Sequence, residues 1–308
     1  MNKYKIDRLA FTLHIRTHVD MDKDERLWVG FNLQAELKAK KCTYQKRNPL
    51  KTHYNDCYQY IVSGDGDDFT VDIWVYPTKK SNNFFRVEFN PNKAGKTGMR
   101  NLFILLKKIL GATTLRAIHG KATITRIDIC CDSDDIENEF YPKLLRGTHS
   151  KVEKDDVGNI TSMISGSKNS RVRLTVYDKN ADAEAKGYEG RDSTWTRLEL
   201  RLRLRCRMAD LNMMRIAKEF SKFEFFDHQF LEDEYFTKKF RNRVSKRGLD
   251  SVFGKLNQRK RDRYRNRLRR DYQQDPWYIE DIESHGKVIS SFLKQFELSK
   301  AYVRLLGN

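Results

Sequence analysis

A strict two-residue alternation over residues 194–207 constrains the fold of this chain more than any other feature of its sequence. In the run TRLELRLRLRCR, apolar residues occupy every second position and mostly charged residues lie between them. Successive side chains of a β-strand point to opposite faces, so such a run can bury its apolar set and keep the charged set on the other face. The pattern predicts one long strand whose charged face carries Arg197, Glu199, Arg201, Arg203, Arg205 and Arg207.

Two further segments show the same alternation and bring more polar groups onto one strand face. In RIDICCD, residues 126–132, the shared face holds Arg126, Asp128, Cys130 and Asp132. In RVRLTVYDK, residues 171–179, it holds Arg173, Thr175, Tyr177 and Lys179. Carboxylates, a tyrosine and several arginines are therefore expected on neighbouring strands.

The expected elements follow a similar order in the two halves of the chain. The first half predicts a strand over 6–15, a hairpin with arms 57–63 and 69–76, a strand over 83–93 and a helix over 99–110. The second half predicts a strand over 124–132, a short helix over 137–145, a hairpin within 160–179, the strand over 194–207 and a helix over 208–220. Residues 149–160 and 181–193 are expected to be loops, and Lys287–Leu306 is expected to be an amphipathic helix.

The two halves also share local motifs. Val71-x-Ile73-x-Val75-Tyr76 matches Val172-x-Leu174-x-Val176-Tyr177, and residues 86–89 match residues 197–200. We interpret this as an internal duplication with a period of about 100 residues. The expected fold is α+β, with mainly antiparallel sheets in two related αβ units. Residues 1–207 would form a catalytic domain with halves 1–120 and 121–207, and 208–308 a helical, basic DNA-binding or accessory region.

The charge of the chain points to a polyanionic partner. There are 60 Lys and Arg residues against 42 Asp and Glu residues, which gives a net charge of +18. No segment approaches the roughly 20 apolar residues that a membrane span needs, so no membrane partner is expected. The five cysteines are odd in number and form no CxxC pair. They disfavour a disulfide framework or zinc site and favour a reducing cytoplasm.

A strand face that mixes carboxylates, a tyrosine and arginines suits the chemistry of a phosphodiester. Carboxylate oxygens hold Mg²⁺ or Mn²⁺, a metal polarises a phosphoryl oxygen, and a phenol can attack phosphorus. The residue types alone leave simpler readings open. Asp128 and Glu199 could pair with the arginines on a solvated sheet face, and Tyr177 could be a packed aromatic residue.

Three motifs in order resemble those of known DNA-nicking proteins. The string SGSKNSRVRLTVYDK, with RIDICCD before it and TRLELRLR after it, resembles the replication initiation factor (Rep_trans) family of plasmid rolling-circle initiators. RVEFNPNK, ITRIDICCD and TRLELRLR are also similar to the filamentous-phage gene II replication proteins. The resemblance covers residues 5–210, and both families perform the same reaction.

This resemblance implies roles for individual residues. Tyr177 of the YDK motif matches the nicking tyrosine, and Lys179 would contact the scissile phosphate. Asp128 and Glu199 match acidic residues that hold the metal, and Asp132 would be a third carboxylate. Asp182 stands where the plasmid pattern often has Glu, within a longer loop, so no role is assigned to it. Glu88, the duplicate of Glu199, is expected to form an ion pair with Arg86.

A second basic feature lies nearer the C-terminus, between Lys238 and Arg270. It contains few acids and an interleaved Tyr264, so we expect it to follow a DNA backbone, although a solvated helix face is the alternative. Together with the strand arginines, the predicted DNA-binding residues are Arg197, Arg201, Arg203, Arg259, Lys260, Arg263, Arg267 and Arg270.

The sequence thus predicts an enzyme, a metal-dependent DNA-nicking endonuclease and strand transferase with a tyrosine nucleophile. The expected function is origin-specific nicking and joining that initiates rolling-circle replication in the cytoplasm of a bacterial host. Expected partners are double-stranded origin DNA, the nicked single strand, a host helicase and a second copy in a homodimer. The alternatives are a conjugative relaxase with the same chemistry and a non-catalytic DNA-binding regulator.

Overall fold

The computed structural model describes residues 4–13, 23–46, 53–79, 85–134, 140–275 and 294 of the 308-residue chain. The chain divides into two compact units. The first unit contains the described residues of Ile6–Asp128 and Arg203–Asn212. The second unit contains the described residues of Ile129–Leu202 and Met213–Gly286, together with Tyr4 and Lys5.

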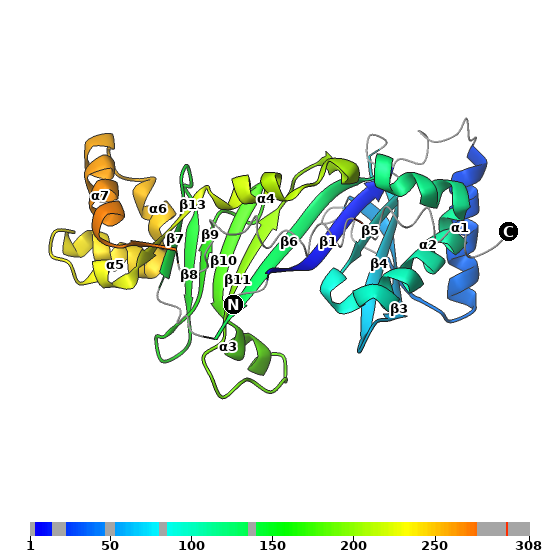
Figure 1. The fold of residues 1–308 in the computed structure, drawn as a ribbon, viewed down its shortest axis with the longest axis horizontal. Coiled ribbons are helices and arrows are strands. Elements are labelled where there is room, and N and C mark those ends of the chain that lie inside the picture. The colour runs from blue at the N-terminus through cyan, green and yellow to red at the C-terminus, as the bar shows by residue number, and fades with distance from the viewer. Residues whose placement is uncertain are drawn as a thin grey trace. The chain divides into compact units, whose positions relative to one another are not determined.

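The first unit is a sheet of antiparallel strands with helices beside it (Figure 1). Its strands are β1 (Tyr4–Leu13), β2 (Thr43–Lys46), β3 (Tyr54–Ser63), β4 (Asp68–Pro77) and β5 (Phe85–Phe89), in the sheet order β2-β3-β4-β5-β1. Its helices are α1 (Lys23–Lys38) and α2 (Pro91–Lys121), and α2 packs against β3 and β4. Alternating residues of β4 and β5 are fully buried, including Ile73 and Val87, so one face of the sheet forms the core.

The second unit contains a sheet built in the same way. Its strands are β8 (Ser150–Lys154), β9 (Ile160–Ser165), β10 (Val172–Asp178), β11 (Thr196–Leu202) and the part of β6 (Thr123–Ser133) from Ile129 onward. They follow the order β8-β9-β10-β11-β6, and the pairs from β8 to β11 are antiparallel. The short helix α3 (Lys179–Glu184) follows β10, and α4 (Met213–Phe220) belongs to the same unit.

The strand order supports the duplication that the sequence predicts. Numbered along the chain within each unit, both sheets have the order 2-3-4-5-1. The fold is α+β with antiparallel sheets, as expected from the sequence. The register corrects one detail of the alignment. Trp74 lies opposite Arg86 in the first unit, as Tyr177 lies opposite Arg197 in the second, so the structural counterpart of Tyr177 is Trp74 and not Tyr76.

The C-terminal part of the second unit has its own aromatic core. Strands β13 (Phe223–Asp227), β14 (Gln273–Gln274) and β7 (Phe140–Leu144) form a small sheet in the order β14-β13-β7. The helices are α5 (Lys238–Arg247), α6 (Leu249–Phe253) and α7 (Gln258–Asp271). Their apolar sides meet in a buried cluster that includes Tyr141, Phe226, Phe230, Phe236, Phe240, Phe253, Tyr264 and Leu268. The module is therefore a folded α+β body, although the sequence predicts helices alone here.

Several local predictions from the sequence are wrong. The helix expected over 137–145 is strand β7 where the structure describes it, because Pro142 has no amide to continue a helix and is tolerated in an edge strand. The strand expected over 194–207 ends at Leu202, and Arg205 adopts a positive φ of 50° before the two-residue β12 (Cys206–Arg207). The loop expected over 149–160 contains β8, and the loop expected over 181–193 begins inside helix α3, which runs to Glu184.

The helix expected over Lys287–Leu306 lies outside the described residues, apart from Lys294. Within the part of the chain that the structure describes, none of the helices is long and apolar enough to cross a membrane.

Candidate active site

Tyr177 lies near the end of β10, on the half-exposed face of the second unit's sheet. Its neighbours on β10 and β11, Val176 and Leu198, are completely buried, whereas Tyr177 is only partly covered. In the antiparallel register Tyr177 stands opposite Arg197 on β11 and opposite Ser162 on β9. Directly opposed residues have Cβ atoms about 5 Å apart and point to the same face. The phenol and the guanidinium group are therefore cross-strand neighbours.

Arg197 is fixed in place by a carboxylate from β6. Its Nε donates to Oδ1 of Asp132 at 2.5 Å and a terminal nitrogen donates to Oδ2 at 2.9 Å, a two-point contact in which both side chains are about 14% exposed or less. Lys5 lies 3.6 Å from the same carboxylate. Burial opposes the charge on Arg197, but Asp132 and the nearby Tyr177 raise the pKa of the guanidinium overall. The pair keeps a protonated guanidinium in a fixed orientation beside the Tyr177 ring.

Glu199 occupies the same strand face, two residues after Arg197. It stands opposite Thr175, and its carboxylate lies 3.6 Å from a terminal nitrogen of Arg201. The side chains of Glu199 and Arg201 are 18% and 21% exposed. Because Arg197 contacts Asp132 from this face, the carboxylates of Asp132 and Glu199 share it. Their hard oxygens suit Mg²⁺ or Mn²⁺, but both oxygens of Asp132 already accept hydrogen bonds from Arg197.

Lys179 begins α3 directly after the strand that carries Tyr177. Its amide donates to the carbonyl of Trp195 at 2.7 Å, which ties the start of α3 to the segment before β11. Its ammonium nitrogen lies 5.9 Å from the centre of the Tyr177 ring and 5.8 Å from that of Trp195. It also forms an ion pair with Asp182. Lys179 thus lies next to Tyr177, and its contact with a scissile phosphate stays a prediction from the sequence.

Asp182, for which the sequence offered no role, restrains this lysine. It also binds Lys186 at 2.6 Å. Burial opposes ionisation of Asp182, yet the hydrogen bonds from Lys179 and Lys186 lower the pKa of its carboxyl overall. The carboxylate is therefore a positioning group for Lys179 in this structure.

Trp195 and Arg191 are site residues that the sequence did not single out. The guanidinium carbon of Arg191 lies 4.0 Å from the centre of the Trp195 ring, and Lys179 lies over the same ring. These contacts join the loop after α3 to the start of β11. A signal was present in the sequence, since Trp195 directly precedes the alternating strand. That position alone does not identify Trp195 as a site residue, because only the fold brings residues 191 and 195 together with Lys179.

The remaining predicted metal ligand, Asp128, belongs to the first unit. It is 3% exposed, and Arg126 Nε donates to its two oxygens at 2.8 and 3.1 Å. Glu88 forms ion pairs with Arg86 at 2.6 Å and with Arg8 at 2.9 Å, which confirms the pairing expected from the sequence. Among the described residues, no group of three or more His, Cys, Asp or Glu side chains is arranged to hold a metal ion.

Helix α7 carries the predicted basic DNA-binding run, but its cations differ in what they contact. Arg259 and Arg263 are exposed, with Arg263 5.8 Å from the centre of the Tyr235 ring. Arg267 contacts Asp233 at 3.1 Å and Asp271 at 2.6 Å, and Arg270 contacts Asp271 at 2.9 Å. The charge that α7 offers to a polyanion is thus concentrated toward its N-terminal half.

Tyr264, the aromatic residue within this run, does not face solvent. It is completely buried in the aromatic core of the module, with its ring centre 4.7 Å from that of Phe240. Its hydroxyl accepts a hydrogen bond from the amide of Thr237 at 3.3 Å. Tyr264 is therefore a core residue and not part of a DNA surface.

Comparison with known proteins gives a weak structural likeness. No protein-family model matches the sequence, and no curated protein matches it. Among solved structures, the chain is similar to the rolling circle replication initiator protein from Geobacillus stearothermophilus, with 18% sequence identity and a TM-score of 0.42. The match covers 73% of this chain and 87% of that chain. A likeness at this level is too weak to assign an activity, which must come from the residues of the site.

Proposed function

We propose that this protein nicks and rejoins one strand of origin DNA to initiate rolling-circle replication, with Tyr177 as the nucleophile. The observation that supports this most directly is the group of side chains around Tyr177. The phenol stands beside the fixed guanidinium of Arg197 and beside Lys179, on a strand face that also carries Glu199. The order of the YDK, RIDICCD and TRLELRLR motifs in the sequence supports the same reaction.

In the proposed reaction, the phenol oxygen of Tyr177 attacks the scissile phosphorus. A bond forms between the tyrosyl oxygen and phosphorus, and the bond from phosphorus to the 3′ oxygen breaks. The phenolic proton passes to solvent, the departing 3′ oxygen takes a proton, and a 5′-phosphotyrosyl link remains. Rejoining reverses these steps when a 3′-hydroxyl attacks the link.

Arg197 and Lys179 supply the positive charge that this step requires. Negative charge builds up on the phosphoryl oxygens in the transition state, and fixed cations stabilise it more than mobile water does. Asp132 keeps Arg197 in one orientation, and Asp182 does the same for Lys179. The 5.9 Å between Lys179 and the Tyr177 ring leaves the ammonium close enough to meet a phosphate that the phenol attacks.

A divalent ion, Mg²⁺ or Mn²⁺, is part of this proposal. Glu199 has the donor chemistry for such an ion, because it presents a partly exposed carboxylate on the same face as Tyr177. Asp132 would be a second oxygen donor only if it released a hydrogen bond from Arg197. When bound, the ion would polarise a phosphoryl oxygen. The role of Asp128 as a metal ligand, with Asp132 as the third carboxylate, remains a prediction from the sequence. We expect Glu199→Gln to lower nicking by about two orders of magnitude, because a metal's charge stabilisation amounts to several kcal/mol.

The proposal includes the setting in which such an enzyme acts. Its partners would be duplex origin DNA, the nicked strand and a host helicase, in the cytoplasm of a bacterial cell, with a homodimer as the expected assembly. A relaxase would perform the same reaction for conjugative transfer, and a regulator would bind the origin without cutting it.

The test is a nicking assay on supercoiled replicon DNA with Mg²⁺ or Mn²⁺. Tyr177→Phe keeps the ring and removes the attacking oxygen, so it should bind DNA with affinity close to that of the wild type and fail to nick. Tyr188→Phe is a matched control, because Tyr188 lies in the same unit and is 69% exposed. Nicking by Tyr177→Phe at the wild-type rate would refute the assignment. Origin binding without nicking by the wild type would identify a regulator.

A further inference from the structure

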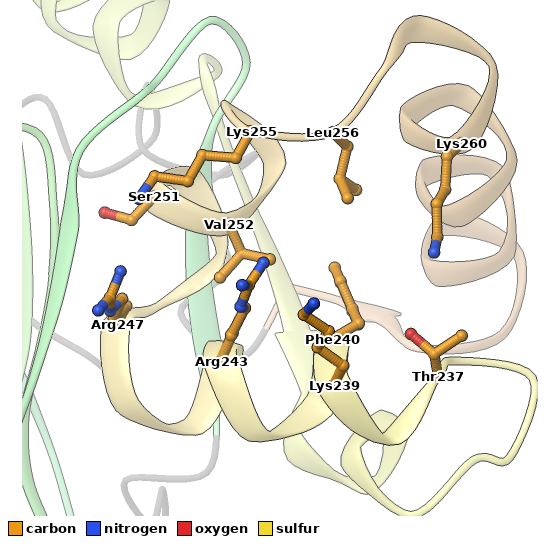
Figure 2. Close-up of a pocket in the computed structure, with 10 residues that line it drawn as sticks. All are labelled: Thr237, Lys239, Phe240, Arg243, Arg247, Ser251, Val252, Lys255, Leu256 and Lys260. Atoms are coloured by element: carbon orange, nitrogen blue, oxygen red, sulfur yellow. The ribbon is translucent and has the colours of Figure 1, made fainter.

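A pocket of about 110 Å³ lies between α5, α6 and the start of α7 (Figure 2). Phe240 and Val252, both less than 5% exposed, contribute apolar walls. Figure 2 shows Arg243 extending from α5 toward α6 and Lys260 extending from α7 toward α5. The pocket lies within the C-terminal module of the second unit and is separate from the Tyr177 site in sequence and in secondary structure.

The charge around this pocket has one sign. Five of its ten lining residues are cations and none is acidic; the cations are Lys239, Arg243, Arg247, Lys255 and Lys260. Among the residues that the structure describes, none of these five forms an ion pair, in contrast to Arg267 and Arg270 on the same module. Five like charges around so small a space repel one another, and apolar walls strengthen their common field. An anion in the pocket would relieve this repulsion.

Lys260 is positioned by the core beneath it. Its nitrogen lies 5.3 Å from the centre of the buried Tyr264 ring. Burial alone would raise the pKa of the Tyr264 phenol, but hydrogen bonds from Thr237 and the charge of Lys260 lower that pKa overall. Thr237 precedes α5 and lines the pocket, and its amide and side chain both hydrogen-bond to the Tyr264 hydroxyl, which ties this wall of the pocket to the core. Lys260, half-buried against the core, is therefore the best-fixed cation of the site, and the exposed Lys239, Arg243, Arg247 and Lys255 surround the opening.

We infer that this pocket binds one backbone phosphate of duplex DNA, outside the segment that is cut. A tetrahedral phosphate matches the converging guanidinium and ammonium donors, and the small volume suits a single anion better than an extended ligand. The inference that the pocket binds an anion is independent of the proposed function; that this anion is a DNA phosphate rests on the proposed function. It gives the C-terminal module a role in gripping DNA that does not depend on nicking.

The first experiment uses inorganic phosphate as the probe and thermal unfolding as the readout. Sodium phosphate should raise the melting temperature of the wild type above its value in sodium chloride at equal ionic strength, because a ligand that binds the folded state stabilises it. The double variant Arg243→Met and Lys260→Met should lose this shift. Lys218→Met is the matched control, since Lys218 is exposed on α4 of the same unit and does not line the pocket. Persistence of the shift in the double variant would overturn the assignment.

The second experiment measures binding of a duplex to full-length protein that carries Tyr177→Phe, so that no cleavage occurs. One lost phosphate contact should lower the slope of log affinity against log salt by about 0.9 in the double variant, with specificity for the origin unchanged. An unchanged slope would refute the inference. The inference would also be refuted if the double variant lost binding to vesicles of acidic phospholipid but bound the duplex as the wild type does. If Arg243→Met and Lys260→Met prevent folding, the exposed pair Lys239→Met and Arg247→Met should give the same two results.

The two proposals can fail independently. A wild type that never nicks DNA but shows both the phosphate shift and the reduced slope would keep the pocket and remove the catalytic assignment. A wild type that nicks through Tyr177 and shows neither effect would do the opposite.

Discussion

Removal of the Asp132 carboxylate charge should have two separable effects, one on stability and one on nicking. Asp132→Asn keeps the shape of the side chain but leaves Arg197 without its anion. The loss of one partner from a buried ion pair costs about 3–5 kcal/mol. Here both side chains keep some solvent contact, at 14% and 13% exposure. We therefore expect the free energy of unfolding to fall by about 2–3 kcal/mol at pH 7.

A double-mutant cycle with Arg197→Met isolates the pair. Each single variant and the double variant are unfolded in urea at pH 7, and the coupling energy is the part of the loss that the two changes share. Two short charge-assisted hydrogen bonds, at 2.5 and 2.9 Å, predict a coupling of about 1.5–3 kcal/mol. A coupling below about 0.5 kcal/mol would show that the pair does not hold Arg197 in place.

The pH dependence gives a second check on the same pair. Burial opposes ionisation of Asp132, but the hydrogen bonds and charge of Arg197 lower the pKa of its carboxyl below the ordinary value of 3.8. A lowered acid pKa contributes stability that is present above the unfolded-state value and is lost as pH falls through the folded-state value. The advantage of the wild type over Asp132→Asn should be constant above about pH 5 and shrink in stronger acid. An advantage that grows in acid would contradict this reasoning.

Three further perturbations test other parts of the structure. Burial raises the pKa of Asp250 from 3.8 to about 6, so the folded state binds an extra proton between these values. As pH rises from 4 to 7, the free energy of unfolding of the wild type should fall by up to about 3 kcal/mol relative to that of Asp250→Asn. A difference between the two proteins that does not change with pH would refute this. Lys179→Met should reduce the nicking rate by about 100-fold while duplex affinity persists, because the fixed charge of Lys179 would stabilise the transferred phosphate in the transition state. An equal loss of nicking rate and duplex affinity would make Lys179 a binding residue. Arg263→Ala should lower the salt slope of DNA binding more than Arg267→Ala, because Arg267 is engaged by two acids; the reverse order would mean that those acids do not compete with DNA.

The local periodicity of the sequence is enough to predict the central strands and their charged face. Strands β10 and β11 lie where alternation places them, and Tyr177, Arg197 and Glu199 share a face as predicted. Periodicity fails where one residue outweighs it. Pro142 converts an apparent helix into an edge strand, and the positive φ at Arg205 ends an alternation that continues in the sequence.

Contacts between distant segments could not be predicted in the same way. Asp132 and Arg197 are 65 residues apart, and only the structure shows that the carboxylate holds this arginine and not Arg201, the other arginine of β11. The core position of Tyr264 depends likewise on α5 packing against α7. A run of basic residues reveals the sign of a surface charge, whereas the fold decides which of those charges remain unneutralised.

Direct detection of the covalent intermediate tests the central claim most closely. The protein is incubated with origin DNA and Mg²⁺ or Mn²⁺, the reaction is stopped with denaturant, and the DNA-linked peptide is identified by mass spectrometry after digestion with trypsin and nuclease. The proposed reaction predicts a single adduct, a 5′-phosphate joined to the phenol oxygen of Tyr177, in the wild type and none in Tyr177→Phe. A 5′ adduct on another residue, or nicked DNA that carries a free 5′-phosphate and no adduct, would contradict it.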